Sequence, residues 1–132
     1  MIFLTAVLAF LGHLAVALAM TALFVWAYMR STPHEEMQLI RSGNAAAAIG
    51  LCGGLIGFAI VLSRAITSSG WVGEVVVWGL IGLAVQVAGH FLLSWFMPRM
   101  YLAIGEGDIA AGVFKAGVAI TLGLLNAASM TP

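Results

Sequence analysis

The stretch AAAAIGLCGGLIGFAIVL, residues 45–62, runs for 18 residues without a charged side chain. A helix needs about 20 mostly apolar residues to cross the hydrocarbon core of a bilayer, so this stretch is long enough for a membrane span. Strands of membrane barrels are segments of about ten residues with alternating polarity, and this continuous run of Ala, Leu, Ile and Gly has no such alternation. The stretch therefore predicts a transmembrane helix.

The composition of the whole chain also indicates a membrane protein. Of its 132 residues 63% are hydrophobic and 8% are charged, and the mean hydropathy is +1.13. A soluble domain carries about 25% charged residues, so this chain has too few charges to be a soluble single domain. The five basic and five acidic residues cancel, which leaves no basic surface for nucleic acid. One cysteine excludes an intramolecular disulfide and a cysteine-cluster metal site.

Three further stretches have the length and polarity of membrane helices, and with the first they use most of the chain. They are residues 2–29, 75–97 and 109–130. We therefore expect one all-α transmembrane domain over residues 1–132. The first stretch resembles a signal peptide around Ala17-Leu18-Ala19, but no Lys or Arg precedes Arg30 and the apolar run continues past that point. We expect it to remain as an uncleaved helix.

The distribution of arginines suggests an orientation in the membrane. Four spans place the first and third loops on one side, and the second loop with both termini on the other. Arg30, Arg41 and Arg99 lie on the first side and Arg64 on the second. Positive residues favour the cytoplasm. We expect a bacterial inner-membrane protein with both termini in the periplasm.

An offset of 64 residues relates the ends of the first and third loops. Residues 40–47 read IRSGNAAA, and residues 104–111 read IGEGDIAA. Each of these loops also opens with a proline after an apolar span, at Pro33 and Pro98. The pattern predicts two helical-hairpin repeats, over about residues 2–63 and 71–130. Each repeat contains an even number of spans, so the two have the same orientation in the membrane.

The first loop has the signals of a short capped helix. Residues 32–35 (TPHE) fit a capping box with proline at the first helical position. Gly43 suits the end of such a helix, and Asn44 and Asp108 suit the caps of the spans that follow. This loop is either a well-capped turn or an exposed cytoplasmic docking surface. The docking residues would be His34, Glu35, Glu36 and Arg41.

Several stretches together carry a resemblance to a known family. They are residues 32–40 (TPHEEMQLI), 43–47 (GNAAA), 54–58 (GLIGF), 78–79 (WG), Gln86, 110–112 (AAG) and 126–131 (NAASMT). The chain resembles the YjfL family of small bacterial inner-membrane proteins over its whole length. The resemblance implies duplicated helical hairpins, no known activity and an association with envelope stress. Val61, where the family pattern leads us to expect proline, and Lys115 depart from that pattern.

Polar residues inside the third and fourth spans form a second pattern. Gln86 and His90 are one helical turn apart, and Lys115 and Asn126 are eleven residues apart, so each pair shares a helix face. We call these four residues the polar seam. They either pair between helices for structural reasons, with Lys115 reaching toward the membrane surface, or form a proton or ion path in which His90 titrates.

Glycines of the second span predict close helix packing. Gly50, Gly53, Gly54 and Gly57 form overlapping patterns of small residues four apart. Such patterns let the backbones of membrane helices approach one another. The partner is either another helix of the same chain or a second copy.

These observations lead to two main hypotheses about function, and a third class, lipid scrambling or lipid binding, fits the same composition. The chain has no phosphate-binding loop, catalytic triad or metal-ligand spacing, so we do not expect an enzyme, a metal or a cofactor. The first hypothesis is a self-associating structural or partner-binding element in envelope maintenance, in contact with lipids, with other copies of itself and with cytoplasmic or membrane proteins. The alternative is a small oligomeric channel or transporter that uses His90 and Lys115.

Overall fold

The structure is a computed structural model that describes residues 1–32 and 36–130. Every element found there is a helix, which confirms the predicted all-α fold. The helices are α1 (Ile2–Ser31), α2 (Glu36–Arg41), α3 (Ala45–Ser68), α4 (Val72–Phe96), α5 (Pro98–Gly105) and α6 (Ile109–Ser129). Four of them, α1, α3, α4 and α6, are long and apolar enough to cross a membrane, and they coincide with the four predicted spans.

The connection between α3 and α4 is shorter than expected. The sequence predicts a loop over residues 63–74, but α3 continues to Ser68 and α4 begins at Val72. The hydroxyls of Thr67 and Ser68 donate to carbonyls of the preceding turn. Ser69 is the C-cap of α3, and its N–H and hydroxyl both donate to the carbonyl of Ala65.

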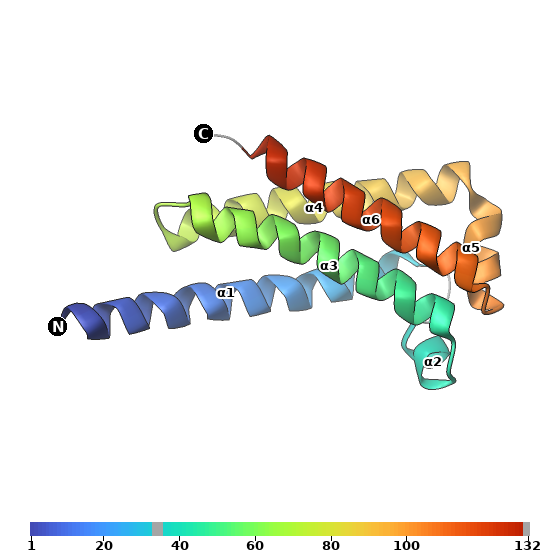
Figure 1. Cartoon of the computed structure of the whole chain (residues 1–132), viewed down its shortest axis with the longest axis horizontal. Helices are drawn as coiled ribbons and strands as arrows, with labels where there is room; N and C mark the ends of the chain where they lie inside the picture. Colours follow the sequence, from blue (N-terminus) through green and yellow to red (C-terminus); the bar gives the residue numbers. More distant parts are fainter. Residues whose placement is uncertain (33–35, 131–132) are drawn as a thin grey trace.

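The four long helices form a bundle in which α3 and α6 lie side by side (Figure 1). The N-terminus and the C-terminal end of α6 lie at one end of the bundle, and the two short helices α2 and α5 lie at the other end. This arrangement follows from an even number of crossings. The N-terminal part of α1 extends past the ends of the other helices (Figure 1).

Small residues bring α3 and α6 into backbone contact. A Cβ atom added at Gly53 would overlap the backbone and side chain of Ala116, and one added at Gly57 would overlap the carbonyl of Ala119. From the other side, a Cβ at Gly112 would lie 2.8 Å from the Cα of Ala46. In the structure Gly53 and Gly57 therefore pack against another helix of the same chain, α6.

Gly50 and Gly54 are also buried within one chain, against other partners. A Cβ at Gly50 would lie 3.3 Å from Cδ of Lys115, and one at Gly54 would lie 3.2 Å from Cζ of Phe24. All four glycines of this face are therefore buried by the chain itself.

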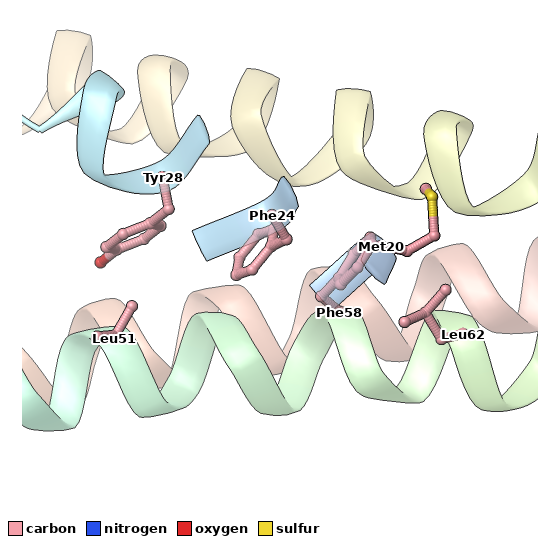
Figure 2. Close-up of a cluster of buried hydrophobic side chains, with 6 residues drawn as sticks. All are labelled: Met20, Phe24, Tyr28, Leu51, Phe58 and Leu62. Atoms are coloured by element: carbon pink, nitrogen blue, oxygen red, sulfur yellow. The ribbon is translucent and has the colours of Figure 1, made fainter. Parts of the chain in front are cut away.

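The C-terminal half of α1 packs on α3 through aromatic and aliphatic side chains. Met20, Phe24 and Tyr28 are the buried residues of α1, and they point toward Phe58 and its neighbours on α3 (Figure 2). The rings of Phe24 and Phe58 are stacked with their centroids 4.8 Å apart. The N-terminal half of α1 contributes no buried residue, and Phe3 is 82% exposed.

The junctions α2–α3 and α5–α6 share one hydrogen-bonding pattern. Gly43 and Gly107 have φ of +92° and +91°, which only glycine adopts readily. Their N–H groups donate to Ile40 and Ile104, and the next residues donate to Leu39 and Ala103. This pair of bonds is the Schellman motif that ends helices. The two junctions are 64 residues apart, as predicted; the larger repeat of two hairpins stays a prediction.

Asn44 links the two junctions. Its Oδ1 accepts a hydrogen bond from the N–H of Ala47 at 3.0 Å, which caps α3 as predicted. Its Nδ2 donates to the carbonyl of Ile104 at 2.8 Å and to that of Gly105 at 3.3 Å, at the end of α5. Asp108 caps α6 through the N–H groups of Ala110 and Ala111. Asn44 therefore forms hydrogen bonds with backbone groups at the start of α3 and at the end of α5.

The substitution Asn44→Asp tests this link. Aspartate keeps the oxygen that caps α3 but removes the donor to α5, and it places a negative charge against two carbonyl oxygens. We expect a loss of about 1–3 kcal/mol in the free energy of unfolding, measured by denaturant titration in mixed micelles. The matched control is Asp108→Asn, which keeps an N-cap on α6. Equal losses in the two variants would show that the bond from Asn44 to α5 contributes nothing.

Candidate functional site

A buried ion pair joins the loop helix α2 to the membrane helix α6. The Nζ atom of Lys115 lies 3.6 Å from Oε1 of Glu36. Lys115 is 3% exposed and Glu36 is 2% exposed. Removing two charges from water is costly, so such a pair persists only when each charge offsets the other. Lys115 thus has a carboxylate partner that the polar seam did not include.

Two tyrosine rings enclose the ammonium group of Lys115. Its Nζ lies 4.5 Å from the ring centroid of Tyr28 on α1 and 4.8 Å from that of Tyr101 on α5. An aromatic ring attracts a cation over its face within about 6 Å. Lys115 therefore draws together α1, α2, α5 and α6 at one end of the bundle.

His90 on α4 completes this group through Tyr101. The phenol oxygen of Tyr101 lies 3.0 Å from Nδ1 of His90 and 3.2 Å from its carbonyl oxygen. Burial, and then the nearby carboxylate of Glu36, raise the pKa of Tyr101 above its ordinary value, so the phenol stays protonated at neutral pH. Its one proton goes either to Nδ1 or to the carbonyl, and in the second case Nδ1–H donates to the phenol oxygen. We call Tyr28, Glu36, His90, Tyr101 and Lys115 the polar cluster.

A small cavity lies beside the polar cluster. Its volume is about 20 Å³, and its lining includes Tyr28, Gln86, His90, Tyr101 and Lys115. A cavity of this size holds about one water molecule. The hydroxyl of Tyr28 is buried and has no hydrogen-bond partner among the residues that the structure describes. One water in the cavity would satisfy it.

The structure brings together three residues of the polar seam. Gln86, His90 and Lys115 line the same cavity, and Nε2 of Gln86 also donates to the carbonyl of Ala119 at 3.1 Å. Asn126 does not line this cavity. It is half-buried, and its Nδ2 would lie 3.5 Å from a Cβ atom added at Gly82.

The prediction of an exposed docking surface on the first loop is wrong for one residue, Glu36. Glu36 is buried against Lys115 rather than exposed, because α2 folds back onto the end of the bundle. Arg41 is exposed, as that hypothesis requires. His34 and Glu35, with Pro33 of the expected capping box, lie outside the residues that the structure describes.

Sequence reasoning missed Glu36, Tyr28 and Tyr101 as members of the site. One signal was available for Glu36, because a lysine inside a membrane helix calls for a partner of opposite charge. Four of the five acidic residues lie in the first and third loops, on the side of the membrane nearer to Lys115. Sequence alone cannot choose the partner of Lys115 among these four.

The fold and the buried polar cluster together define a multi-pass integral membrane protein. Comparison with known sequences agrees. The chain belongs to the family described as Domain of Unknown Function (DUF350), whose family model matches residues 1–130. The resemblance to the YjfL family seen in the sequence is thereby confirmed, and four apolar helices with inner-membrane relatives make this a multi-pass inner-membrane protein.

Two relatives illustrate the family. The chain is 34% identical over 128 residues to "UPF0719 inner membrane protein YjfL" of Escherichia coli (strain K12), covering 97% of each chain. It is 22% identical over 121 residues to "UPF0719 transmembrane protein YshE" of Bacillus subtilis (strain 168), covering 90% of each. No solved structure matches the chain.

Proposed function

We propose that this protein is a self-associating structural or partner-binding element of the inner membrane that serves envelope maintenance. The N-terminal half of α1 is the observation that carries the proposal. Phe3 and Phe10 are 82% and 62% exposed, and this part of α1 extends past the other helices (Figure 1). A 30-residue helix is roughly 45 Å long, longer than the hydrocarbon core of a bilayer, which is about 30 Å thick.

The uncovered part of α1 continues the face that packs on the bundle. Met20, Phe24 and Tyr28 follow one another at four-residue steps on that face. At about 100° per residue, Ala6 and His13 lie on the same face farther toward the N-terminus. Ala6 is exposed and His13 is half-buried. A packing face with a small residue at Ala6 and little intramolecular cover fits the α1 helix of a second copy.

Polar groups on this part of α1 support the same proposal. The hydroxyl of Thr5 donates to the carbonyl of Met1, and Nδ1 of His13 lies 2.7 Å from the carbonyl of Ala9. Both bonds lie within α1. A histidine in an apolar helix is costly when it faces lipid. Contact with a second copy would give its Nε2 a protein environment.

The polar cluster fits a structural role in this proposal. Its ion pair and cation–π contacts join α1, α2, α5 and α6, and the adjoining cavity of about 20 Å³ has room for about one water. A file of waters across the bilayer would need many times this volume. The cluster thus stabilises the end of the bundle, where the loops that carry Arg30, Arg41 and Arg99 would face the cytoplasm with both termini periplasmic.

Cysteine crosslinking tests the assembly in native membranes. In a Cys52→Ser background, Ala6→Cys places a thiol on the uncovered face of α1, and Ala15→Cys places one on the opposite face. Both positions are exposed, and nine residues separate them, which is about half a turn apart around the helix. We expect mild oxidation to give a disulfide-linked dimer with Ala6→Cys and little with Ala15→Cys. Equal crosslinking at both positions, or none at either, would contradict assembly through this face.

A second candidate function is conduction of protons or ions by a small oligomer. The observation in its favour is that Gln86, His90 and Lys115 line one cavity. It predicts a flux in proteoliposomes that is abolished by His90→Ala while the fold is retained. Unchanged flux in that variant, or no flux from the wild type, would remove this candidate.

A further inference from the structure

A groove lies at the end of the bundle, between the last turn of α1 and the corner where α4 meets α5. Its volume is about 420 Å³, within the range of small-molecule sites. It is a separate hollow from the cavity of the polar cluster, although Ser31 and Tyr101 line both. The lining residues are Arg30, Ser31, Thr32, Ser94, Pro98 and Tyr101.

Exposed tryptophans place this groove at the level of lipid headgroups. Trp26 lies one turn before Arg30 on α1 and is 58% exposed, and Trp95 follows Ser94 on α4 and is 82% exposed. Tryptophan is enriched where a membrane helix passes from hydrocarbon to headgroups. The two tryptophans belong to the two helices that border the groove, so the groove lies at the depth of the membrane interface.

Arg30 supplies the positive charge among the described residues that line the groove. Its guanidinium carbon lies 5.5 Å from the ring of Trp26, so the side chain is held on the surface of α1. No acidic residue is among the described residues that line the groove. Guanidinium binds phosphate oxygens through paired hydrogen bonds.

The serine hydroxyls of the groove act as acceptors. Ser31 donates to the carbonyl of Ala27 at 2.7 Å, and Ser94 donates to that of Phe91 at 2.8 Å. Each hydroxyl proton is therefore already used, and the oxygens are left to accept hydrogen bonds. The groove thus combines a donor for phosphate with acceptors for hydroxyl groups.

We propose that this groove binds the headgroup of an anionic phospholipid, with the phosphate on Arg30 and headgroup hydroxyls on Ser31 and Ser94. Phosphatidylglycerol has both features, since its phosphate carries a negative charge and its terminal glycerol carries hydroxyl donors. Phosphatidylcholine has a phosphate but no headgroup donor, and its net charge is zero. The groove therefore prefers the phosphoglycerol headgroup, and basic pockets between membrane helices are a general means of such recognition.

Native mass spectrometry with defined lipids tests the site. The detergent-solubilised full chain is titrated with phosphatidylglycerol or phosphatidylcholine, and the lipid-bound fraction is measured for the wild type, Arg30→Gln and Arg41→Gln. Arg41 is exposed on the loop helix α2 and does not line the groove, so its variant removes an equal charge elsewhere. We expect Arg30→Gln to weaken phosphatidylglycerol binding about tenfold, as for one charge-assisted hydrogen-bonded contact.

Each outcome bears on the proposal. Tighter binding of phosphatidylglycerol than phosphatidylcholine, reduced by Arg30→Gln and not by Arg41→Gln, supports it. Equal losses in the two variants would show attraction by overall charge and overturn it, as would equal binding of the two lipids. An excess of inorganic phosphate that displaces the lipid completely would show a free-anion site in place of a lipid site. Because Arg30 is exposed, Arg30→Gln should unfold at the same temperature as the wild type.

Discussion

Gly53→Ala is expected to destabilise the bundle strongly, by about 3 kcal/mol or more, or to prevent the protein from accumulating. A methyl group at this position would overlap the Cα and Cβ of Ala116 on α6. Overpacking usually costs about 1–3 kcal/mol. Here the obstacle is backbone, which cannot rotate away, so α3 and α6 would have to separate along their contact. Unfolding by detergent titration measures the loss.

Gly117→Ala on α6 is the matched control. No atom lies within 4 Å of the position that its Cβ would take, and the residue is exposed. Alanine is favoured over glycine in a helix by about 1 kcal/mol in water, so we expect unchanged or slightly higher stability. If Gly53→Ala were as stable as Gly117→Ala, the close contact of α3 with α6 would be wrong.

Glu36→Gln and Lys115→Met are expected to have the second large effect. Each change removes one member of the buried ion pair, and breaking such a pair costs about 3–5 kcal/mol. The double variant removes both charges and should be more stable than the sum of the two single losses predicts. Unfolding of all four proteins in mixed micelles gives the coupling energy between the two sites.

Glu106→Gln is the control for this cycle. Glu106 is exposed at the end of α5, so its change should lie within about 0.5 kcal/mol of the wild type. Additive losses from Glu36→Gln and Lys115→Met would show that the two side chains do not interact. In that case α2 would not be held to the bundle by this pair.

The four spans could be predicted from sequence because the signal lies in continuous stretches of the chain. A run such as residues 45–62 has no charge, and a membrane leaves few alternatives for it. The helix ends at Gly43 and Asn44 were predictable for a similar reason, since a Schellman motif and an N-cap depend on adjacent residues. These features are set by local physics.

The candidate site could not be predicted in full, because it is formed by contacts between distant parts of the chain. Glu36 lies in a polar loop, where a carboxylate is normally solvated, and its burial follows only from the way α2 folds onto α6. Tyr101 had the sequence position of an interfacial aromatic residue, yet it is 3% exposed and bonds to His90. Both contacts join side chains on different helices, and the spacing of residues within one helix cannot predict such contacts.

Asn126 shows the limit of assigning a site from one helix face. It shares a face of α6 with Lys115 at three-turn spacing, and the sequence therefore placed both residues in the polar seam. The structure puts Asn126 away from the cavity and near Gly82 on α4. Lys115 and Asn126 are eleven residues apart, roughly 16 Å along α6, so they meet different neighbours although they share a face.

Copy number in the membrane tests the central claim, that the uncovered half of α1 joins copies of this protein. Native mass spectrometry of the full chain released from lipid nanodiscs measures it directly. We expect a dimer or a larger closed assembly that persists as the lipid-to-protein ratio is raised. A monomer at every ratio would contradict self-association and leave lipid as the only neighbour of the N-terminal half of α1.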